Sequence, residues 1–382
     1  MASPTAPTNG ATNTTMGQTH LQNIDLRSFA ELQEAERAYL SLYASSPDSL
    51  NLLNQRADHI RHLLNETPDE LAYFERNLAV IRTWLEEHPF AGAGLCVFAC
   101  EMLDYVQGIA LPVAPVDTLR VDAAPYIRPL AELQDEYENF LVVAADNEVT
   151  RIIQVTSARA ATAERVRGDI KNHVRKGGWS QQRYERRRDK DLLHYAKEIN
   201  DVLGDLVRKG NFQRIILLGS QETLTKLKEV LTTEVAERIV GQAPADLHEE
   251  EDTLVASAYE LFFQEERDEE ERLWERIQAE YLRDGLAAVG PAPVLDALHL
   301  GRVAEVLVTR DVQVEGTRCA ACERVVAVTV AVCPLCGEEQ VFPVDLVEEL
   351  VRQAELTSAT VEFSDPIGGL RGVGDVAALL RY

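Results

Sequence analysis

The 382-residue chain is short of positive charge: 38 Lys and Arg stand against 63 Asp and Glu, a formal net charge of −25. It has no apolar run near the roughly 18 residues that a membrane helix needs. Residues 1–20 have neither the basic nor the apolar region of a signal peptide, and they predict a disordered tail. These absences argue against a membrane partner and predict a cytoplasmic protein.

The remaining composition is that of a folded protein. Apolar residues make up 46% of the chain, and 382 residues at roughly 100–200 per domain predict two or three domains. Cys96 and Cys100 lie on a predicted strand with no further ligands nearby, which favours core thiols over a metal site. The pattern of the first domain predicts a helical stretch over 29–64 with a short strand at 38–43, a helix over 69–87, strands at 94–100 and 106–113, and Pro-rich connections over 112–129.

The middle of the chain predicts an α/β unit. Two apolar runs around an Asp-Asn turn predict a hairpin over 140–155, and the run 212–219 predicts a buried strand. Apolar residues at helical spacing predict a core-facing helix over 189–206 and an amphipathic helix over 223–240. Residues 246–272 are crowded with acids, for which a solvated helix face is favoured over a metal or general-acid role.

One segment departs from the acidic character of the chain. Between residues 165 and 190 there are ten Lys or Arg and only three Asp or Glu. Clustered cations contribute most where phosphates are bound, because each neutralised phosphate releases counterions. The alternative is a solvated helix whose Arg side chains pair with acids elsewhere. Gly177 and Gly178 favour phosphate binding, since two residues without a Cβ let the backbone approach a ligand closely. For the neighbouring His173, a structural or phosphate-facing role is favoured over a catalytic base, because no nucleophile motif accompanies it.

This basic segment resembles a loop of a known family. The sequence from Gly177 to Arg188, Gly-Gly-Trp-Ser-Gln-Gln-Arg-Tyr-Glu-Arg-Arg-Arg, is similar to the Gly-Gly-Gln-Ser-x-x-Arg-Phe-x-Arg-x-Arg loop of archaeal and eukaryotic class-I peptide-chain release factors. Pelota and a group of bacterial release-factor-like proteins share that fold, and the segment resembles the bacterial branch more than the termination factors. In release factors the Gln of the loop helps place water on the peptidyl-tRNA ester. Trp179 occupies that position here, and Gln181 follows two residues later.

The resemblance implies roles for individual residues. It implies catalytic contributions from Gly177, Gly178 and Gln181. It also implies RNA contacts from the residues around them, namely Arg175, Lys176, Trp179, Arg183, Arg186, Arg187 and Arg188. The implied partners are the ribosome, through rRNA and peptidyl-tRNA, and a translational GTPase that contacts the C-terminal domain. We expect a monomer off the ribosome.

Other segments carry the resemblance in the family's order. The strand run 212–220 ends Leu-Leu-Gly-Ser, like the family's Leu-Ala-Gly-Ser, residues 293–309 resemble its helix-then-strand unit, and the tail 372–382 is close to its Gly-Gly-Ile-Ala-Ala-Ile-Leu-Arg-Tyr terminus. The implied fold is three mixed α/β domains, at 25–138, 139–276 and 277–382, after a tail at 1–24. The Asn-Ile-Lys-Ser and Tyr-x-Cys-x-x-x-Phe segments with which relatives read stop codons are absent. Stop-codon reading is therefore not expected.

The most specific metal signal lies in the third predicted domain. Cys319-Ala-Ala-Cys322 and Cys333-Pro-Leu-Cys336 are two Cys-x-x-Cys knuckles separated by ten residues. Four thiolates at this spacing can close a tetrahedral zinc site, and a closed four-Cys site is structural. The apolar run between the knuckles predicts a short β-hairpin and hence a zinc ribbon; some archaeal release factors carry a similar insertion. Two disulfides are disfavoured in a cytosolic protein, and a redox Cys-x-x-Cys would not need a second knuckle.

Two classes of function are compatible with these residues. The first is a peptidyl-tRNA hydrolase, in which the basic helix holds RNA phosphates and the 177–181 loop positions water. The second is a non-hydrolytic ribosome binder, as Pelota is in rescue and as its bacterial relative Balon is in hibernation. Trp179 and the missing codon-reading motifs favour the second, whereas Gly177, Gly178 and the nearby Gln181 keep the first open. A release-factor-like fold acting on RNA away from ribosomes is a weaker third alternative.

Overall fold

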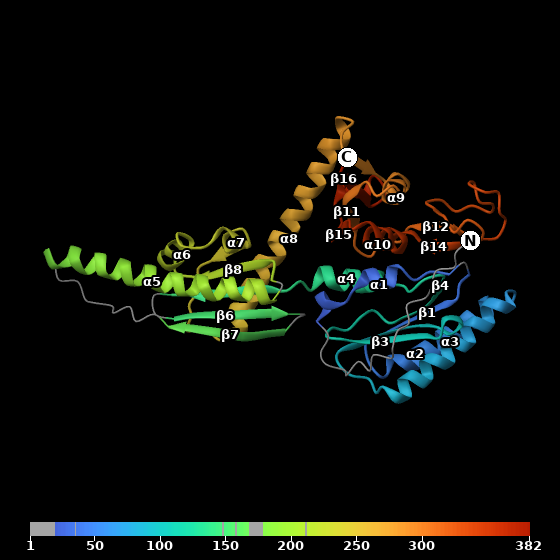
Figure 1. Ribbon diagram of the computed structural model, residues 1–382, viewed down its shortest axis with the longest axis horizontal. Coiled ribbons are helices and arrows are strands. Elements are labelled where there is room, and N and C mark those ends of the chain that lie inside the picture. The colour runs from blue at the N-terminus through green and yellow to red at the C-terminus, as the bar shows by residue number, and fades with distance from the viewer. Residues whose placement is uncertain (1–19, 35, 147–148, 157–158, 168–178, 211) are drawn as a thin grey trace. The chain divides into compact units, whose positions relative to one another are not determined.

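The computed structural model describes residues 20–34, 36–146, 149–156, 159–167, 179–210 and 212–382 (Figure 1). The chain divides into two compact units, residues 1–129 and 130–382. Within the described residues there are four sheets with helices packed against them. The predicted mixed α/β class is therefore confirmed, and none of the described helices is long and apolar enough to cross a membrane.

The first unit is built on one antiparallel sheet, ordered β3-β2-β1-β4. Its strands are β1 (Tyr39–Ala44), β2 (Gly94–Cys100), β3 (Tyr105–Leu111) and β4 (Thr118–Asp122). Its helices are α1 (Leu26–Ala30), α2 (Ser49–Leu63) and α3 (Pro68–Glu87). Because successive residues of a strand face opposite sides, Val97 packs in a core with α3 while the neighbouring Phe98 contacts Phe29 of α1. The predicted helix over 69–87 and strand over 94–100 are confirmed.

Two elements of this region were expected to be connections. Strand β4 and helix α4 (Arg128–Glu136) both fall in or next to the Pro-rich stretch 112–129, where the sequence predicted loops. Strand β4 lies at the edge of the sheet, and its only strand partner among the described residues is β1, which is remote in sequence. Its five residues are too few to show a periodic pattern, so only the pairing with β1 reveals it.

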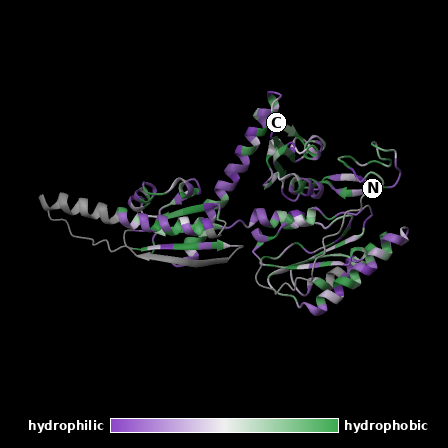
Figure 2. Cartoon of the chain, in the orientation of Figure 1, coloured by the Kyte–Doolittle hydropathy of each residue, from purple (hydrophilic) through white to green (hydrophobic). Residues whose placement is uncertain are grey.

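The second unit begins with a five-stranded sheet, ordered β7-β6-β5-β8-β9. Its strands are β5 (Phe140–Ala145), β6 (Val149–Thr156), β7 (Arg159–Arg167), β8 (Arg214–Gly219) and β9 (Ile239–Ala243). Strands β5 and β6 form the predicted antiparallel hairpin, and β8 is the predicted buried strand, parallel to β5. Figure 2 shows β8 as mainly hydrophobic, and every residue of β5 is buried, as expected for strands covered on both faces.

Helices cover both faces of this sheet. On one face, Leu141 and Val143 of β5 share a core with α5 (Trp179–Gly210), α6 (Gln221–Lys228) and α7 (Thr233–Ala236). On the other face, Phe140 and Val142 share a core with the first half of α8 (Glu251–Leu282). The alternating residues of one strand therefore fix which helix lies on which side.

The predicted helix over 223–240 is wrong in its extent. The structure has two short helices, α6 and α7, and then β9, which adds a fifth strand parallel to β8. The predicted helix over 189–206 forms the larger part of α5, and the side chains of Ala196 and Ile199 lie in the core as expected. The difference arises because β9 contributes only a short apolar run, which periodicity cannot assign to a strand or a helix.

A glycine is required where β8 ends. Gly219 has φ +143°, and a Cβ at this position would lie 1.9 Å from the carbonyl oxygen of Ala145 on the neighbouring strand. The next residue, Ser220, caps α6 by accepting a hydrogen bond from the backbone N–H of Thr223. The Gly-Ser pair thus turns the chain from a central strand directly into a helix.

The rest of the second unit contains a four-stranded and a three-stranded sheet, ordered β10-β16-β11-β15 and β13-β12-β14. The strands are β10 (Ala287–Val289), β11 (Val303–Thr309), β12 (Glu315–Cys319), β13 (Val325–Val326), β14 (Val341–Asp345), β15 (Thr360–Ser364) and β16 (Val376–Leu380). The helices are α9 (Pro291–His299), α10 (Leu346–Thr357) and α11 (Gly368–Arg371). Strand β16, from the C-terminal tail, is central in its sheet, between β10 and β11.

Two expectations for this region are corrected by the structure. The hairpin expected between the Cys knuckles does not form within that run; instead β13 pairs with β12, across the first knuckle. The hydroxyl of Thr317 lies 2.8 Å from the carbonyl oxygen of Val328 and 3.2 Å from the backbone nitrogen of Val330, taking the place of strand partners. The acids of α8 are also not all solvated, because the side chain of Glu266 is only 18% exposed.

Candidate functional site

The basic segment lies at the start of α5. Four of its predicted site residues, Arg175, Lys176, Gly177 and Gly178, fall outside the described residues, as does His173. The remaining predicted site residues lie on α5, where the backbone is helical from Trp179 onward and the side chains are not described. These remaining residues are Trp179, Gln181, Arg183, Arg186, Arg187 and Arg188. The cations from 183 onward therefore lie within the first turns of one helix, directly after the glycine pair.

Polar as well as apolar contacts fix the C-terminal half of α5 to the sheet and to the connection before α7. The hydroxyl oxygens of Tyr195 on α5 and Thr150 on β6 lie 2.7 Å apart in the interior. The side chain of Asn200, also buried, accepts a hydrogen bond of 2.9 Å from the backbone N–H of Thr232. In Figure 1 the first turns of α5 continue beyond the ends of β6 and β7. The helix is thus held at one end and carries its cations at the other.

The four cysteines of the two knuckles form one cluster. Their sulfur atoms all lie within 4.8 Å of one another, with Sγ–Sγ distances of 3.5 Å for Cys319–Cys336 and 3.7 Å for Cys322–Cys333. No pair is at the roughly 2.05 Å of a disulfide. A tetrahedral zinc site with Zn–S bonds of about 2.3 Å places its sulfurs about 3.8 Å apart. The cluster therefore fits a four-coordinate metal ion of this kind.

The backbone around the cluster explains this convergence. Each knuckle is followed by a residue in the left-handed region, Glu323 with φ 59° and Gly337 with φ 81°. In both, that residue donates its backbone N–H to the carbonyl oxygen of the first cysteine of its knuckle, at 3.0 and 2.9 Å. The two knuckles thus have the same tight turn, which directs both thiols of each pair to one side.

The other two cysteines are separate from this cluster. Cys96 and Cys100 lie on β2 and have no exposed surface. Burial raises the pKa of both thiols. The prediction that they are core residues is confirmed.

Sequence reasoning missed a second polar cluster, centred on Arg214 of β8. This guanidinium contacts Glu138, Glu266 and Glu269, and an Asp135–Arg310 pair lies nearby in the same unit. The acidic run of α8 was visible in the sequence, but its partners are far away along the chain. Nothing local distinguishes Glu266 from its solvated neighbours.

Sequence comparisons relate the chain to known proteins. Residues 125–261 match the model of the bacterial archaeo-eukaryotic release factor family 10. Over 302 residues the chain is 27% identical to peptide chain release factor subunit 1 of Archaeoglobus fulgidus, covering 73% of this chain and 74% of that protein. The same factor of Thermococcus kodakarensis is 25% identical over 348 residues, covering 82% and 84%.

Among solved structures, the chain is similar to S. cerevisiae Dom34, described as a translation termination-like factor that is involved in RNA quality control pathways and interacts with Hbs1. The identity is 12%, the alignment covers 78% of this chain and 75% of that one, and the TM-score is 0.42.

Proposed function

We propose that this chain, a member of the archaeo-eukaryotic release-factor and Pelota superfamily, binds the ribosomal A site and places the start of α5 near the peptidyl-tRNA ester. The observation that carries the proposal is that the glycine pair directly precedes the cationic helix α5 in the sequence. This helix lies within residues 125–261, the part of the chain that matches the release-factor family model. Similarity to archaeal release factors over 73% of the chain supports the same class.

In this proposal the residues of α5 divide into two tasks. The cations at 183 and 186–188 bind RNA phosphates, because clustered positive charge in an otherwise acidic chain serves that purpose best. Gly177 and Gly178 let the backbone approach the tRNA end, and Gln181 orients water, since an amide can both donate and accept hydrogen bonds. The ribosome supplies the rest of the reaction site, so oriented water and polar groups suffice for hydrolysis.

The second candidate is a ribosome rescue or hibernation factor that cleaves nothing. It is favoured by one observation: Trp179 stands where release factors have the water-placing Gln. An indole at this position stacks on a base, a contact worth about 1–3 kcal/mol. The same residue thereby strengthens binding and removes the group that hydrolysis uses.

We further propose that the four-cysteine cluster holds one structural zinc ion. Cysteine thiolates at tetrahedral spacing suit zinc, and a site with four protein ligands has no open position for catalysis. We also propose domain limits of 25–138, 139–276 and 277–382, with the last domain contacting a translational GTPase. The resemblance of residues 293–309 and 372–382 to the C-terminal domain of release factors supports this assignment.

The two candidate functions are separated by a release assay. Purified protein is added to ribosomes from its own species that carry labelled peptidyl-tRNA, and both free peptide and A-site occupancy are measured. Peptide release above the spontaneous rate supports the hydrolase. Occupancy without release supports the non-hydrolytic factor, and neither occupancy nor release contradicts both.

A further inference from the structure

Helix α8 belongs to two hydrophobic cores. Its first half packs on the five-stranded sheet through Leu254, Val255, Ala258 and Phe262. Its second half packs in a core with β11 and β16 through Leu273, Trp274 and Ile277. Residues 263–272 between them, all of which the structure describes, contain no buried apolar side chain and eight charged ones. At 1.5 Å per residue this stretch is about 15 Å long.

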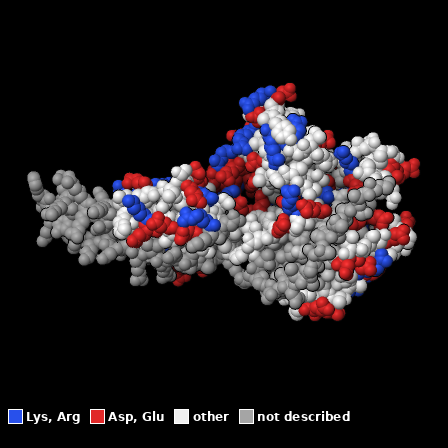
Figure 3. All heavy atoms as spheres, viewed as in Figure 1, with Lys and Arg blue, Asp and Glu red and all other residues white. Residues whose placement is uncertain are grey.

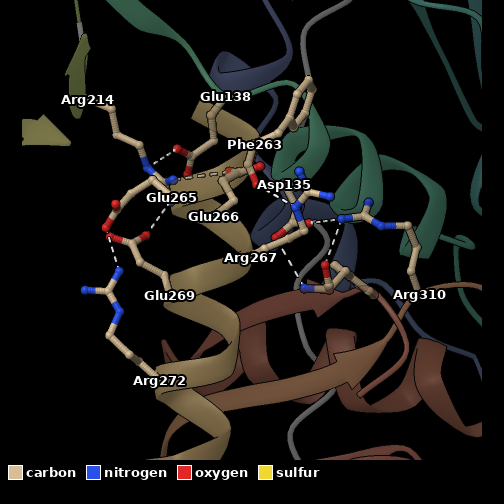
Figure 4. Close-up of polar contacts among 11 residues, drawn as sticks. Asp135, Glu138, Arg214, Phe263, Glu265, Glu266, Arg267, Glu269, Arg272 and Arg310 are labelled. Carbon is tan, nitrogen blue, oxygen red and sulfur yellow. Dashed lines mark hydrogen bonds and ion pairs between the residues drawn. The ribbon is translucent and has the colours of Figure 1, made fainter. Parts of the chain in front are cut away.

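On one side, Arg214 joins the stretch to the five-stranded sheet (Figure 4). Arg214 of β8 places Nε 3.0 Å from Glu138 Oε2, Nη1 3.3 Å from Glu266 Oε1 and Nη2 3.0 Å from Glu269 Oε2. Its guanidinium also lies 5.1 Å from the centre of the Phe262 ring. With its side chain 14% exposed, Arg214 is shielded from water, and these contacts are stronger than those of a surface pair.

On the other side, polar contacts join the stretch and its surroundings to the C-terminal sheet. Glu270 Oε2 accepts a hydrogen bond of 3.3 Å from the backbone N–H of Asp365, after β15. Asp135 accepts from the backbone N–H of Phe363 at 3.3 Å and lies 3.0 Å from Nη2 of Arg310. In this part of α8, hydrogen bonds and ion pairs replace the apolar contacts found at both ends.

These groups surround a cleft with an excess of negative charge. The cleft has a volume of about 430 Å³, and its lining includes three Arg and six acids, namely Asp135, Glu266, Glu269, Glu270, Glu305 and Glu362. Figure 3 shows acidic side chains gathered in the hollow beside α8. The carboxylates that line the cleft repel one another, and this repulsion is larger where water is partly excluded.

Protons reduce this repulsion at neutral pH. Burial raises the pKa of Glu266 to about 8. The positive charge of Arg214 lowers this pKa, and the negative charges of Glu138, Asp135 and Glu270 raise it further. Burial also raises the pKa of Glu362 to about 8. The charges of Asp135, Glu138 and Glu305 raise this pKa further, and the charge of Arg214 lowers it. A carboxyl whose pKa is raised in the packed state destabilises that state as pH rises from the ordinary value near 4.3 to the raised one. The packed arrangement is therefore strongest in acid and weakest above about pH 8.

We propose that residues 263–272 form a joint at which α8 bends when the carboxyl groups of the cleft lose their protons. The two ends of the helix stay attached to their own cores, because apolar burial does not depend on protonation. The stretch between them is held instead by the ion pairs to Arg214 and the hydrogen bond of Glu270, which depend on the charge of the carboxyl groups. This inference concerns the free protein and does not depend on the proposed ribosomal function.

Hydrogen exchange of the full chain at pH 5.5 and 8.5 tests the joint. The measured quantity is the exchange rate of amides 263–272 divided by that of amides 254–262 and 273–277, a ratio in which the intrinsic effect of pH cancels. The ratio should rise about tenfold, the change that one unit of pKa represents. In the double variant Glu266→Gln/Glu362→Gln the ratio should rise less than in wild type, because Glu270 and Asp135, whose pKa values burial raises to about 7 and about 6, are then the cleft carboxyls left to titrate in this range. The double variant Glu271→Gln/Glu275→Gln removes the same number of carboxylates from exposed positions of the same helix that do not line the cleft, and it should behave like wild type.

Three results would overturn the proposal: an unchanged ratio in wild type, a wild-type response in the double variant, or equal acceleration of the reference amides. A second variant covers the case in which the double variant does not fold. Arg214→Lys keeps the charge but loses the contacts to three carboxylates, so its ratio should be high at both pH values, whereas the exposed Arg208→Lys should leave it unchanged. A low ratio at pH 5.5 in folded Arg214→Lys would equally exclude the joint.

Discussion

The hydroxyl oxygen of Tyr195 lies 2.7 Å from that of Thr150, and both side chains are buried, at 3% and 0% exposure. The first residue is on α5 and the second on β6, so the contact crosses from the basic helix to the sheet. It supplies a directional bond within an otherwise apolar interface. Burial also raises the pKa of Tyr195 to about 12, which keeps its hydroxyl protonated at any physiological pH.

Replacing Tyr195 by Phe should lower the free energy of unfolding by about 1–3 kcal/mol, because Thr150 loses this partner inside the protein. The double variant Tyr195→Phe/Thr150→Val should recover part of this loss, since both polar groups are then gone. Urea unfolding of wild type, of the single variants Tyr195→Phe and Thr150→Val, and of the double variant measures these free energies. His194→Ala is the control, because the side chain of His194 is exposed on the same helix, with its Nε2 at 3.6 Å from Glu198 Oε1. If the double variant were as unstable as the sum of the single ones, the hydrogen bond would contribute nothing.

Wild-type protein purified under reducing conditions should contain one zinc per chain, and Cys333→Ser should contain little or none. The third proposed domain should also lose stability, because a structural zinc contributes directly to folding. Elemental analysis and thermal unfolding measure the two effects. Cys96→Ser is the matched control, since it changes a buried thiol that is outside the cluster and should leave the metal content unchanged. A wild-type protein without metal would exclude the site.

Changing Arg186, Arg187 and Arg188 to Glu should weaken ribosome binding strongly and flatten its dependence on salt, because phosphate contacts carry that dependence. Binding is measured by co-sedimentation over a range of salt concentrations. The control changes Arg208, Lys226 and Lys228 to Glu, which alters the net charge equally on the same unit. Equal effects of the two triple variants would mean that overall charge, rather than the basic helix, determines binding.

If the chain hydrolyses peptidyl-tRNA, Gln181→Ala should lower the release rate by more than about tenfold, or about 1.4 kcal/mol in barrier. Its affinity for the ribosome should remain close to that of wild type, because the amide acts on water rather than on RNA. Single-turnover peptide release with saturating protein measures the rate without a contribution from binding. Gln182→Ala, one residue further along α5, serves as the control. Equal rates for wild type and Gln181→Ala would remove this residue from the reaction.

Trp179→Ala should lower ribosome affinity and leave the release rate unchanged, the reverse of the effect expected for Gln181→Ala. Loss of base stacking should weaken ribosome binding by about 1–3 kcal/mol, while the release rate at saturation stays the same. Trp179→Phe, which retains an aromatic face, should keep much of the affinity. An alanine variant that binds like wild type would show that the indole contacts no base.

Features set by neighbouring residues could be predicted from the sequence. Strands β5 and β8 are continuous apolar runs, and α3 shows helical periodicity, because burial on one or both faces dictates the residue types. The four cysteines were found for a similar reason, since two knuckles with fixed internal spacing bring their own ligands together. The Gly219-Ser220 turn also depends only on local conformation and capping.

Tertiary structure alone decided features whose partners are remote along the chain. Residues 239–243 form strand β9 because their backbone pairs with β8, although the residues themselves are compatible with a helix. The division of the acids of α8 into exposed and buried ones followed from the position of Arg214 on another element. The hydrogen bond between Thr150 and Tyr195 likewise required two elements to meet in register. A sequence pattern records the average environment of a residue, whereas a specific polar contact depends on which atom faces it, and only the packed chain fixes that.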